Sequence, residues 1–356
     1  PGIAEAPIYV PGAHGDDTAA IPPAVLSANE NPLGPSPKAI AAYGEAIHLN
    51  RYPDGGATQL RQTLATQFGL DVNRIVCGAG SDELITLLIR CYVGPGDEVL
   101  QTQHGFLMYG ITAKTVGATP VLAPETPDLH TDVDALLACV TDKTRICFVA
   151  NPNNPTGTYI PGSELRRLRD GLREDILLVI DAAYSEYVDA SDYSDGCDLV
   201  EDYQNVVMLR TFSKLYGLAA LRLGWCYAPE AVVDALNRVR SPFNVNNSAQ
   251  AAGIAALGDQ DHVEISLAQN AEQLKRLCGA LSQLGLGFPP SVCNFVLIRF
   301  NDADTAKRAL SHLADQGVIV RSVAGYGLAE SLRATIGTAA ENDRLIAGLT
   351  DFMNKG

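Results

Sequence analysis

Residues 211–225, TFSKLYGLAALRLGW, place one lysine inside an otherwise mostly apolar segment. Lys214 follows Ser213 and precedes Arg222 by eight residues. A lysine whose stem lies on apolar surface and whose head reaches water is the ordinary expectation, because lysine is seldom buried without a partner. A buried amine, however, has a lowered pKa, since burial disfavours the charged form, and an unprotonated amine attacks carbonyl groups. The segment therefore predicts either a surface lysine or a nucleophile held inside the protein.

Short apolar runs on both sides of this segment predict a mostly parallel sheet. They are separated by segments of helical period, and they lack the strict alternation of a half-exposed strand. The runs are RIVCG (74–78), DEVLQT (97–102), TPVLAP (119–124), TRICFVA (144–150), ILLVID (176–181) and NVVMLRTF (205–212). Strands that alternate with helices in this way are typical of a doubly wound α/β domain.

The two ends of the chain have a different pattern. The first forty residues are rich in proline and glycine, which predicts an extended arm rather than packed secondary structure. In the last third, strands and helices follow one another in a mixed α+β order. We expect an arm that adds part of a small domain at 1–40, a large domain at 41–247 and a small C-terminal domain at 248–356.

The composition excludes several classes of partner. The formal charge of −15 argues against a nucleic-acid or anionic-membrane surface, but it leaves a small anionic substrate possible. The eight cysteines form no Cys-x-x-Cys pair and the six histidines are scattered, which predicts reduced thiols and no metal site. Because no signal-like segment opens the sequence and no apolar run reaches membrane-spanning length, we expect a cytoplasmic protein.

Polar residues follow two of the predicted strands. Asp181 ends ILLVID, with Tyr184 three residues later, and Asn151 follows TRICFVA in NPNNPTG (151–157). Ligands gather beyond the carboxyl ends of parallel strands, and a carboxylate there can hold a proton on a cofactor's ring nitrogen. A helix cap for Asp181 and an ordinary turn for Asn151 are the competing interpretations.

The stretch CGAGSDELITLL (77–88) joins a strand to the start of a helix. Small residues let the backbone approach an anion there, and the helix N-terminus offers free N–H groups. The stretch lacks the third glycine of a dinucleotide fingerprint and the Gly-Lys-Ser/Thr ending of a P-loop, so a dinucleotide dehydrogenase is excluded. Thr211, Ser213 and Arg222 would suit the same phosphate.

NPNNPTG, DAAY (181–184) and TFSKLYGLAALRLGW, in that order, resemble the fold-type I aminotransferases that use pyridoxal phosphate. Six further motifs are similar to the histidinol-phosphate aminotransferases, and the resemblance covers nearly the whole chain. They are LSANENPLGPSP (26–37), RYPDGG (51–56), GAGSDE (78–83), HGFLMY (104–109), VIVRSV (318–323) and LRATIGT (332–338). The resemblance implies a large sheet domain sandwiched by helices, a smaller α+β domain, and amino transfer between L-histidinol phosphate and 2-oxoglutarate.

The resemblance also implies a role for each matching residue. Lys214 would form the Schiff base with the cofactor and then move the proton between the substrate Cα and the cofactor C4′. Asp181 would pair with the pyridinium nitrogen. The other cofactor contacts would be Asn151 and Tyr184 at the 3′-oxygen, Phe106 on the ring, Gly80, Ser81, Asp82, Thr211, Ser213 and Arg222 at the phosphate, and Tyr52 at the phosphate of the neighbouring subunit of a homodimer.

Five residues would bind the substrate, and one of them, Asn151, would also contact the cofactor. Arg333 matches the family arginine that clamps an α-carboxylate, for which a bidentate guanidinium is the natural receptor. Arg321 would bind the substrate phosphate, although an exposed charge at a strand end is a serious alternative. Tyr9 would close over the substrate, and Asn31 would contribute to the pocket.

Other functions share most of these motifs. An aromatic amino acid aminotransferase and, less favoured, a pyridoxal-phosphate-dependent decarboxylase of an amino-acid phosphate would need the same cofactor residues. A transcription regulator with an aminotransferase-like domain is disfavoured, because such proteins carry a basic DNA-binding segment and this arm has none.

Overall fold

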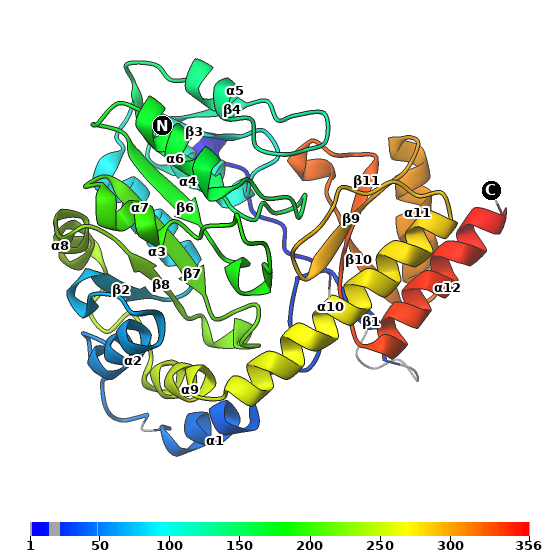
Figure 1. Ribbon diagram of the computed structural model, residues 1–356, viewed down its shortest axis with the longest axis horizontal. Helices are drawn as coiled ribbons and strands as arrows, with labels where there is room; N and C mark the ends of the chain where they lie inside the picture. Colours follow the sequence, from blue (N-terminus) through cyan, green and yellow to red (C-terminus); the bar gives the residue numbers. More distant parts are fainter. Residues whose placement is uncertain (1, 14–21, 48, 356) are drawn as a thin grey trace.

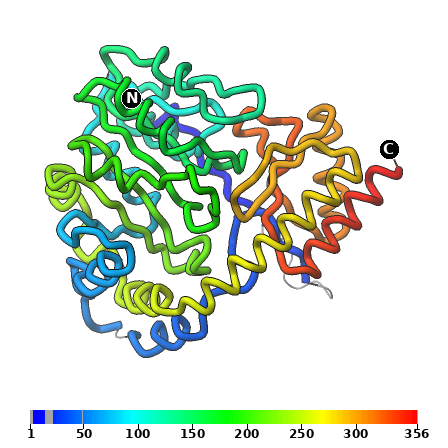
Figure 2. Tube along the Cα trace, in the orientation of Figure 1, coloured from blue at the N-terminus to red at the C-terminus, as the bar shows by residue number. Residues whose placement is uncertain are grey.

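The computed structural model describes residues 2–13, 22–47 and 49–355. These residues form a seven-stranded sheet and a four-stranded sheet, each with its own helices (Figure 1). The 24-residue helix α10 (Gln260–Gln283) runs from beside the large sheet to the small one, as the chain trace in Figure 2 shows. No helix in the described part of the chain is both long enough and apolar enough to cross a membrane.

The large sheet has the strand order β2-β8-β7-β6-β5-β3-β4. Its strands are β2 (Ile75–Gly78), β3 (Glu98–Thr102), β4 (Thr119–Ala123), β5 (Thr144–Ala150), β6 (Leu177–Asp181), β7 (Val206–Thr211) and β8 (Gly224–Tyr227). Strand β8 runs antiparallel to β2 and β7, and the other six strands share one direction. The prediction of a mostly parallel sheet is confirmed, and the carboxyl ends of β5, β6 and β7 lie side by side.

Helices cover both faces of this sheet, because successive strand residues point to opposite sides. On β7, Val207 and Leu209 face one core while Val206 and Met208 face the other. The first core includes α3 (Ser81–Tyr92), α4 (Leu107–Thr115) and α8 (Glu230–Val239). The second includes α2 (Thr58–Phe68), α5 (Val133–Ala138), α6 (Gly162–Gly171), α7 (Cys197–Asp202) and α9 (Asn247–Leu257), and α1 (Pro37–Glu45) packs against α9.

The small sheet has the order β1-β10-β11-β9. Its strands are β1 (Ala24–Leu26), β9 (Phe295–Arg299), β10 (Val318–Ser322) and β11 (Ser331–Thr335). One face packs against α10, α11 (Ala303–Asp315) and α12 (Ala339–Lys355). The other face contributes Phe295 and Leu297 to smaller apolar clusters that include residues of the large-sheet region.

Strand β1 corrects the expectation that the N-terminal segment lacks packed secondary structure. Ala24 and Leu26 are fully buried in the small core, and β1 pairs in parallel with β10. The sequence AVL supplies two inward apolar side chains, and the edge of β10 supplies backbone partners. These two gains outweigh the local preference for an extended arm.

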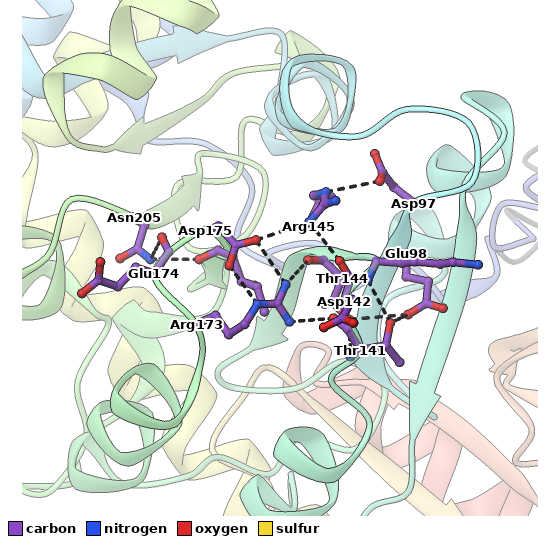
Figure 3. Close-up of polar contacts among 12 residues, drawn as sticks. Asp97, Glu98, Thr141, Asp142, Thr144, Arg145, Arg173, Glu174, Asp175 and Asn205 are labelled. Atoms are coloured by element: carbon purple, nitrogen blue, oxygen red, sulfur yellow. Dashed lines mark hydrogen bonds and ion pairs between the residues drawn. The ribbon is translucent and has the colours of Figure 1, made fainter.

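A polar network lies at the amino ends of the parallel strands of the large sheet (Figure 3). Arg145 Nε lies 3.2 Å from Asp97 Oδ1, and Arg173 Nε donates to Asp175 Oδ1 at 2.9 Å. These residues lie at or just before the amino ends of β3, β5 and β6, and their side chains are partly exposed. At the carboxyl ends of β6 and β7, by contrast, Asp181 and Arg210 are buried.

Candidate active site

A cavity of about 240 Å³ opens at the carboxyl ends of β5, β6 and β7 and is also lined by the small sheet. Most of the predicted site residues line it: Tyr9, Ser81, Asp82, Phe106, Asp181, Tyr184, Thr211, Ser213, Lys214, Arg222, Arg321 and Arg333. Gly80, Asn31, Asn151 and Tyr52 are not among its lining residues. Residues far apart in the sequence thus meet at one place, as parallel-sheet geometry requires.

Lys214 lies just beyond β7, with its backbone anchored by the buried neighbours Phe212 and Leu215. Its Nζ donates to the carbonyl oxygen of Ala28 at 3.1 Å, and no carboxylate of the described residues lies within ion-pair distance. Burial and, to a smaller extent, the nearby Arg333 guanidinium together lower the pKa of Lys214 to about 8. About a tenth of the Lys214 side chains are therefore unprotonated at pH 7, and the unprotonated amine is the state that attacks a carbonyl.

Asp181 ends β6 at the floor of the cavity. Its Oδ2 accepts a hydrogen bond from the hydroxyl of Tyr109 at 2.7 Å, and its Oδ1 accepts from the backbone N–H of Ala183 at 3.2 Å. Burial raises the pKa of Asp181 to about 6, against the opposing effect of the Tyr109 bond. Sequence reasoning missed Tyr109, although it ends the HGFLMY motif that supplied Phe106.

The start of α3 forms an anion cradle with the loop after β7. Gly80 has φ +82°, and a Cβ there would lie 2.5 Å from Nη2 of Arg222, so a side chain would fill the cradle. Arg222 Nη1 donates to Ser213 Oγ at 3.3 Å, and its Nη2 lies 3.0 Å from Asp82 Oδ2. Backbone N–H groups at a helix N-terminus, hydroxyls and one guanidinium are the donors that suit a phosphate dianion.

Two arginines form the other end of the cavity. Arg321 on β10 and Arg333 on β11 are directly opposed across the strands, so both project from the same face of the small sheet. Arg333 is buried; its Nη2 donates to the carbonyl oxygen of Ser27 at 2.8 Å, and its Nε has no hydrogen-bond partner in the described residues. Arg321 is half-buried and donates to the carbonyl oxygen of Val10 at 2.6 Å. An arginine with an unused buried donor is suited to receive an anionic ligand group.

The structure corrects the choice of Asn151. Its amide is used by the backbone: Oδ1 accepts from Ile160 N–H at 2.9 Å and Nδ2 donates to Ile160 O at 3.1 Å. Asn154, three residues later in the same NPNNPTG turn, lines the cavity and accepts a hydrogen bond from Arg333. Asn151 directly follows the strand, whereas the turn carries the third asparagine of the motif, Asn154, into the cavity.

Two other predicted residues, Asn31 and Tyr52, do not line the cavity of their own chain. The Asn31 amide donates to Leu215 O at 2.7 Å and to Ser266 Oγ at 3.1 Å, so it fixes the loop that carries Lys214. Tyr52 is 83% exposed and stacks on Phe243, with ring centroids 4.6 Å apart.

Asn29 is a cavity residue that the sequence reasoning missed. Its Nδ2 donates to the hydroxyl oxygen of Tyr184 at 2.9 Å, and its Oδ1 accepts from Thr335 Oγ1 at 3.3 Å. Burial raises the pKa of Tyr184, so its hydroxyl stays protonated and able to donate. Asn29 belongs to the LSANENPLGPSP motif (26–37), and its place in that motif is the sequence signal for it.

This donor set fits pyridoxal phosphate. The Gly80 cradle suits the phosphate, the Asp181 carboxylate suits a protonated ring nitrogen, and the Lys214 amine suits the aldehyde. Phe106 offers an aromatic face to the ring, and its own edge contact with Tyr109 (centroids 5.7 Å apart) holds it in place.

Comparison with known proteins gives the same family. A family model described as aminotransferase class I and II matches residues 22–349. A histidinol-phosphate aminotransferase of Paramagnetospirillum magneticum is 57% identical over 331 residues, 92% of this chain and 91% of that protein. Another from Rhodospirillum centenum is 51% identical over 362 residues, 99% of this chain and 98% of that one. The crystal structure of histidinol-phosphate aminotransferase from Sinorhizobium meliloti in complex with pyridoxal-5′-phosphate is similar with a TM-score of 0.92 and 28% identity, covering 99% and 97% of the two chains. The chain therefore belongs to the aminotransferase class I and II family.

Proposed function

We propose that this protein uses pyridoxal phosphate to transfer an amino group between L-histidinol phosphate and 2-oxoglutarate, giving imidazole-acetol phosphate and L-glutamate. The observation that carries the proposal is Lys214, an amine with a lowered pKa that faces the same cavity as Asp181 and two clusters of anion-binding groups. The names of the relatives support this substrate pair. The resulting role is a step of histidine biosynthesis.

The chain's own residues divide the chemistry among them. The bound cofactor supplies an electron sink for the substrate Cα. Asp181 would hold a proton on the cofactor's ring nitrogen, while the hydroxyl of Tyr184, oriented by Asn29, would donate to the cofactor's 3′-oxygen. The Lys214 amine would hold the cofactor and, as a free base, would accept the proton of the substrate Cα.

Each end of the cavity binds a different anion. The Gly80 cradle, with Ser213 and Arg222, binds the cofactor phosphate. Arg333 binds the α-carboxylate of glutamate, and Arg321 binds the phosphate of histidinol phosphate, which has no carboxylate. Tyr9 lies over this end, with Arg321 5.9 Å from its ring centroid.

The Arg321 assignment has its own test. Arg321→Ala is expected to lower kcat/KM for histidinol phosphate by about 10²-fold while lowering it for phenylalanine by less than about threefold. An equal loss with both donors would show that Arg321 does not bind the substrate phosphate.

We also propose that the site is completed in a homodimer by Tyr52 from the partner. The exposed stack of Tyr52 on Phe243 supports this, because two large aromatic rings lie together on the surface. Mixing Tyr52→Ala with Lys214→Ala subunits tests it. Hybrid dimers would carry one site with both native residues and regain activity that neither variant has alone, whereas a mixture without regained activity contradicts the proposal.

Two further assignments are proposals of the same kind. We propose a cytoplasmic location, supported by eight cysteines that are all free thiols, and cell fractionation tests it. We propose an arm at 1–40, a large domain at 41–247 and a small domain at 248–356. The proposed boundary at 247/248 falls at the start of α9, but α9 packs against α1 and α2, as a helix of the large domain would. Limited proteolysis will show whether the boundary lies before or after α9.

The decisive experiment measures half-reactions with single amino donors. Purified protein with pyridoxal phosphate is expected to have a visible absorbance band that L-histidinol phosphate bleaches much faster than L-phenylalanine does. Faster bleaching by phenylalanine or tyrosine would make the protein an aromatic aminotransferase, and release of carbon dioxide from an amino-acid phosphate would make it a decarboxylase. No band would contradict the role of Lys214.

A further inference from the structure

His104 links the two sheets beside the cavity. It lies in the turn between β3 and α4, two residues before Phe106. Its Nδ1 lies 2.6 Å from the carbonyl oxygen of Tyr326, which belongs to the 3₁₀ helix η5 (Ala324–Tyr326) between β10 and β11. A carbonyl oxygen only accepts hydrogen bonds, so His104 Nδ1 must carry the proton. One imidazole therefore ties the turn of Phe106 to the turn that joins the two arginine-bearing strands.

Glu125 fixes the other side of this imidazole. Its Oε1 accepts from the backbone N–H of His104 at 3.2 Å, and its Oε2 lies 3.7 Å from His104 Nε2. The Glu125 side chain is only 2% exposed, and Oε2 has no hydrogen-bond partner in the described residues. Burial raises the pKa of Glu125, and His104 opposes this rise. The His104 ring is therefore packed beside a buried carboxylate, with its Nε2 facing Oε2.

The turn at 324–327, which accepts the His104 hydrogen bond, has no side chain where the His104 ring packs. Gly327 has φ +82°, and a Cβ there would lie 3.3 Å from both Cε1 and Nδ1 of the His104 ring. Tyr326 is buried with Leu297, Val323 and other apolar side chains, and Leu107, which follows Phe106, packs against this cluster. The two turns are thus joined by one polar bond inside an apolar contact, where a hydrogen bond is poorly replaced by water.

The linked turns reach both ends of the cavity. Phe106 lines the end that suits the cofactor ring and makes an edge contact with Tyr9, with centroids 6.4 Å apart. On the other side, η5 follows β10 and precedes β11, the two strands that carry the opposed residues Arg321 and Arg333. His104 itself lines no part of the cavity, so it can act only through these neighbours.

We propose that His104, held by Glu125, is a positioning residue that sets the spacing between Phe106 and the Arg321–Arg333 pair. The proposal rests on the proposed aminotransferase function, because this spacing matters when one ligand must contact both ends at once. Loss of the link then weakens substrate binding while Lys214, Asp181 and the phosphate cradle stay intact.

The test compares three variants with a matched control. His104→Leu removes both ring nitrogens at similar volume, His104→Gln keeps an N–H that can donate to Tyr326 O, and Glu125→Gln removes the carboxylate. The control is His312→Leu, because His312 pairs with Asp351 at 3.2 Å on the outer helices α11 and α12, away from the cavity. All four are compared with the unaltered protein.

The first readout is hydrogen exchange of the backbone at 323–328, measured without cofactor. His104→Leu is expected to speed this exchange by about tenfold, and His312→Leu to leave it unchanged. The second readout is steady-state kinetics with whichever amino donor the unaltered protein uses. His104→Leu is expected to raise KM about tenfold with kcat within about threefold and with the visible cofactor band retained, and His104→Gln to recover most of the loss.

Three results would overturn the proposal. Unchanged exchange and unchanged KM in His104→Leu would show that the link positions nothing, and equal losses in His104→Gln and His104→Leu would show that the bond to Tyr326 is not the cause. If His104→Leu does not fold, Glu125→Gln decides, with the same rise in KM expected and an unchanged KM contradicting it. If the unaltered protein uses no amino donor, the proposed function fails, and the exchange readout still decides whether His104 holds the turn.

Discussion

Arg210 is buried and Lys214 is half-buried; these two cations lie four residues apart, and their surroundings shift their pKa values in opposite directions. Arg210, on β7, has two carboxylate partners: its Nη2 lies 2.9 Å from Glu186 Oε1 and its Nη1 lies 3.1 Å from Asp195 Oδ2. Its guanidinium carbon also lies 4.4 Å from the ring centroid of Phe68. Burial alone would lower the pKa of Arg210, but the two carboxylates outweigh it and raise the pKa.

Lys214, in the loop after the same strand, has no such partner, and burial lowers its pKa to about 8. The comparison teaches that burial is not what distinguishes a functional charge from a structural one. A buried charge that is fully paired holds elements together, whereas one that lacks a partner retains reactivity for a ligand. The following predictions test this distinction, from the largest expected effect to the smallest.

Lys214→Ala should abolish amino transfer. We expect kcat to fall by at least about 10⁴-fold, because both the nucleophile and the proton carrier are removed. Steady-state kinetics measure this, with Arg210→Met as the contrasting variant. Retention of more than a hundredth of the activity in Lys214→Ala would erase the distinction between the two cations.

Arg210→Met should instead destabilise the fold. The change leaves Glu186 and Asp195 without their shared cation, which costs roughly 3–5 kcal/mol of unfolding free energy. Urea unfolding measures the loss, and the activity of the remaining folded protein should stay within about threefold. A loss of activity without a loss of unfolding free energy would show that Arg210 acts in the reaction and not in holding the fold together.

Asp181→Asn tests the unpaired anion of the site. The amide can still accept the Tyr109 hydrogen bond, but it cannot hold a proton on a ring nitrogen, so kcat should fall by about 10²-fold. Tyr109→Phe is the matched control and should cost less than about tenfold, because it removes only the orienting bond. A smaller effect for Asp181→Asn than for Tyr109→Phe would contradict the role given to the carboxylate.

The free energy of unfolding should depend on pH, because neither Lys214 nor Asp181 has, among the described residues, a partner of opposite charge that offsets the cost of burying its charged form. The folded pKa of Lys214, about 8, lies below its ordinary value of 10.5, so its burial destabilises the fold below pH 8 and this effect disappears as pH rises to 10.5. The folded pKa of Asp181, about 6, lies above its ordinary value of 3.8, so its destabilising effect is absent below pH 3.8 and complete above pH 6.

Two variants make this pH dependence measurable in cofactor-free protein. Lys214→Met should be more stable than the unaltered protein by roughly 1–3 kcal/mol below pH 8, with the gain shrinking above it. The gain from Asp181→Asn should grow between pH 4 and pH 6. Urea titrations at several pH values check both, and a gain that runs in the opposite direction would show that the groups are paired.

The exposed network of Figure 3 gives the smallest expected effect. Arg145 contacts Asp97 and Asp175, but its side chain is 36% exposed, so water can replace these contacts. Arg145→Met should cost about 1 kcal/mol or less in urea unfolding and leave activity unchanged. A loss comparable to that of Arg210→Met would mean that the number of partners, and not their burial, sets the stabilisation.

The main parts of the fold and the cavity could be predicted because they follow from short sequence patterns. Apolar runs separated by helical periods predicted the mostly parallel sheet, and parallel strands bring their carboxyl ends together without further information. For this reason Asp181 and Lys214, which follow adjacent strands, could be placed in one cavity. Their roles stay predictions until the variants are measured.

The remaining details depend on turn geometry and tertiary contacts. Asn151 and Asn154 are both asparagines of one short turn. Only the backbone path of that turn shows that Asn154 lines the cavity and Asn151 does not. Strand β1 could not be predicted, because its partner β10 lies far along the chain and three residues carry too little periodicity. The proposed contribution of Tyr52 would come from a second subunit and is not visible in the contacts of one chain.

The pairing of β1 with β10 also sets an order of events during synthesis. Ala24 pairs with Val318. At roughly 5–20 residues per second, the ribosome completes β10 roughly 15–60 s after it releases β1. Until then the small sheet lacks its edge strand, and the Ser27 carbonyl that accepts a hydrogen bond from Arg333 is not in place. A nascent chain can therefore build the large sheet and its phosphate cradle first, whereas the arginine end of the cavity is assembled only once translation is nearly finished.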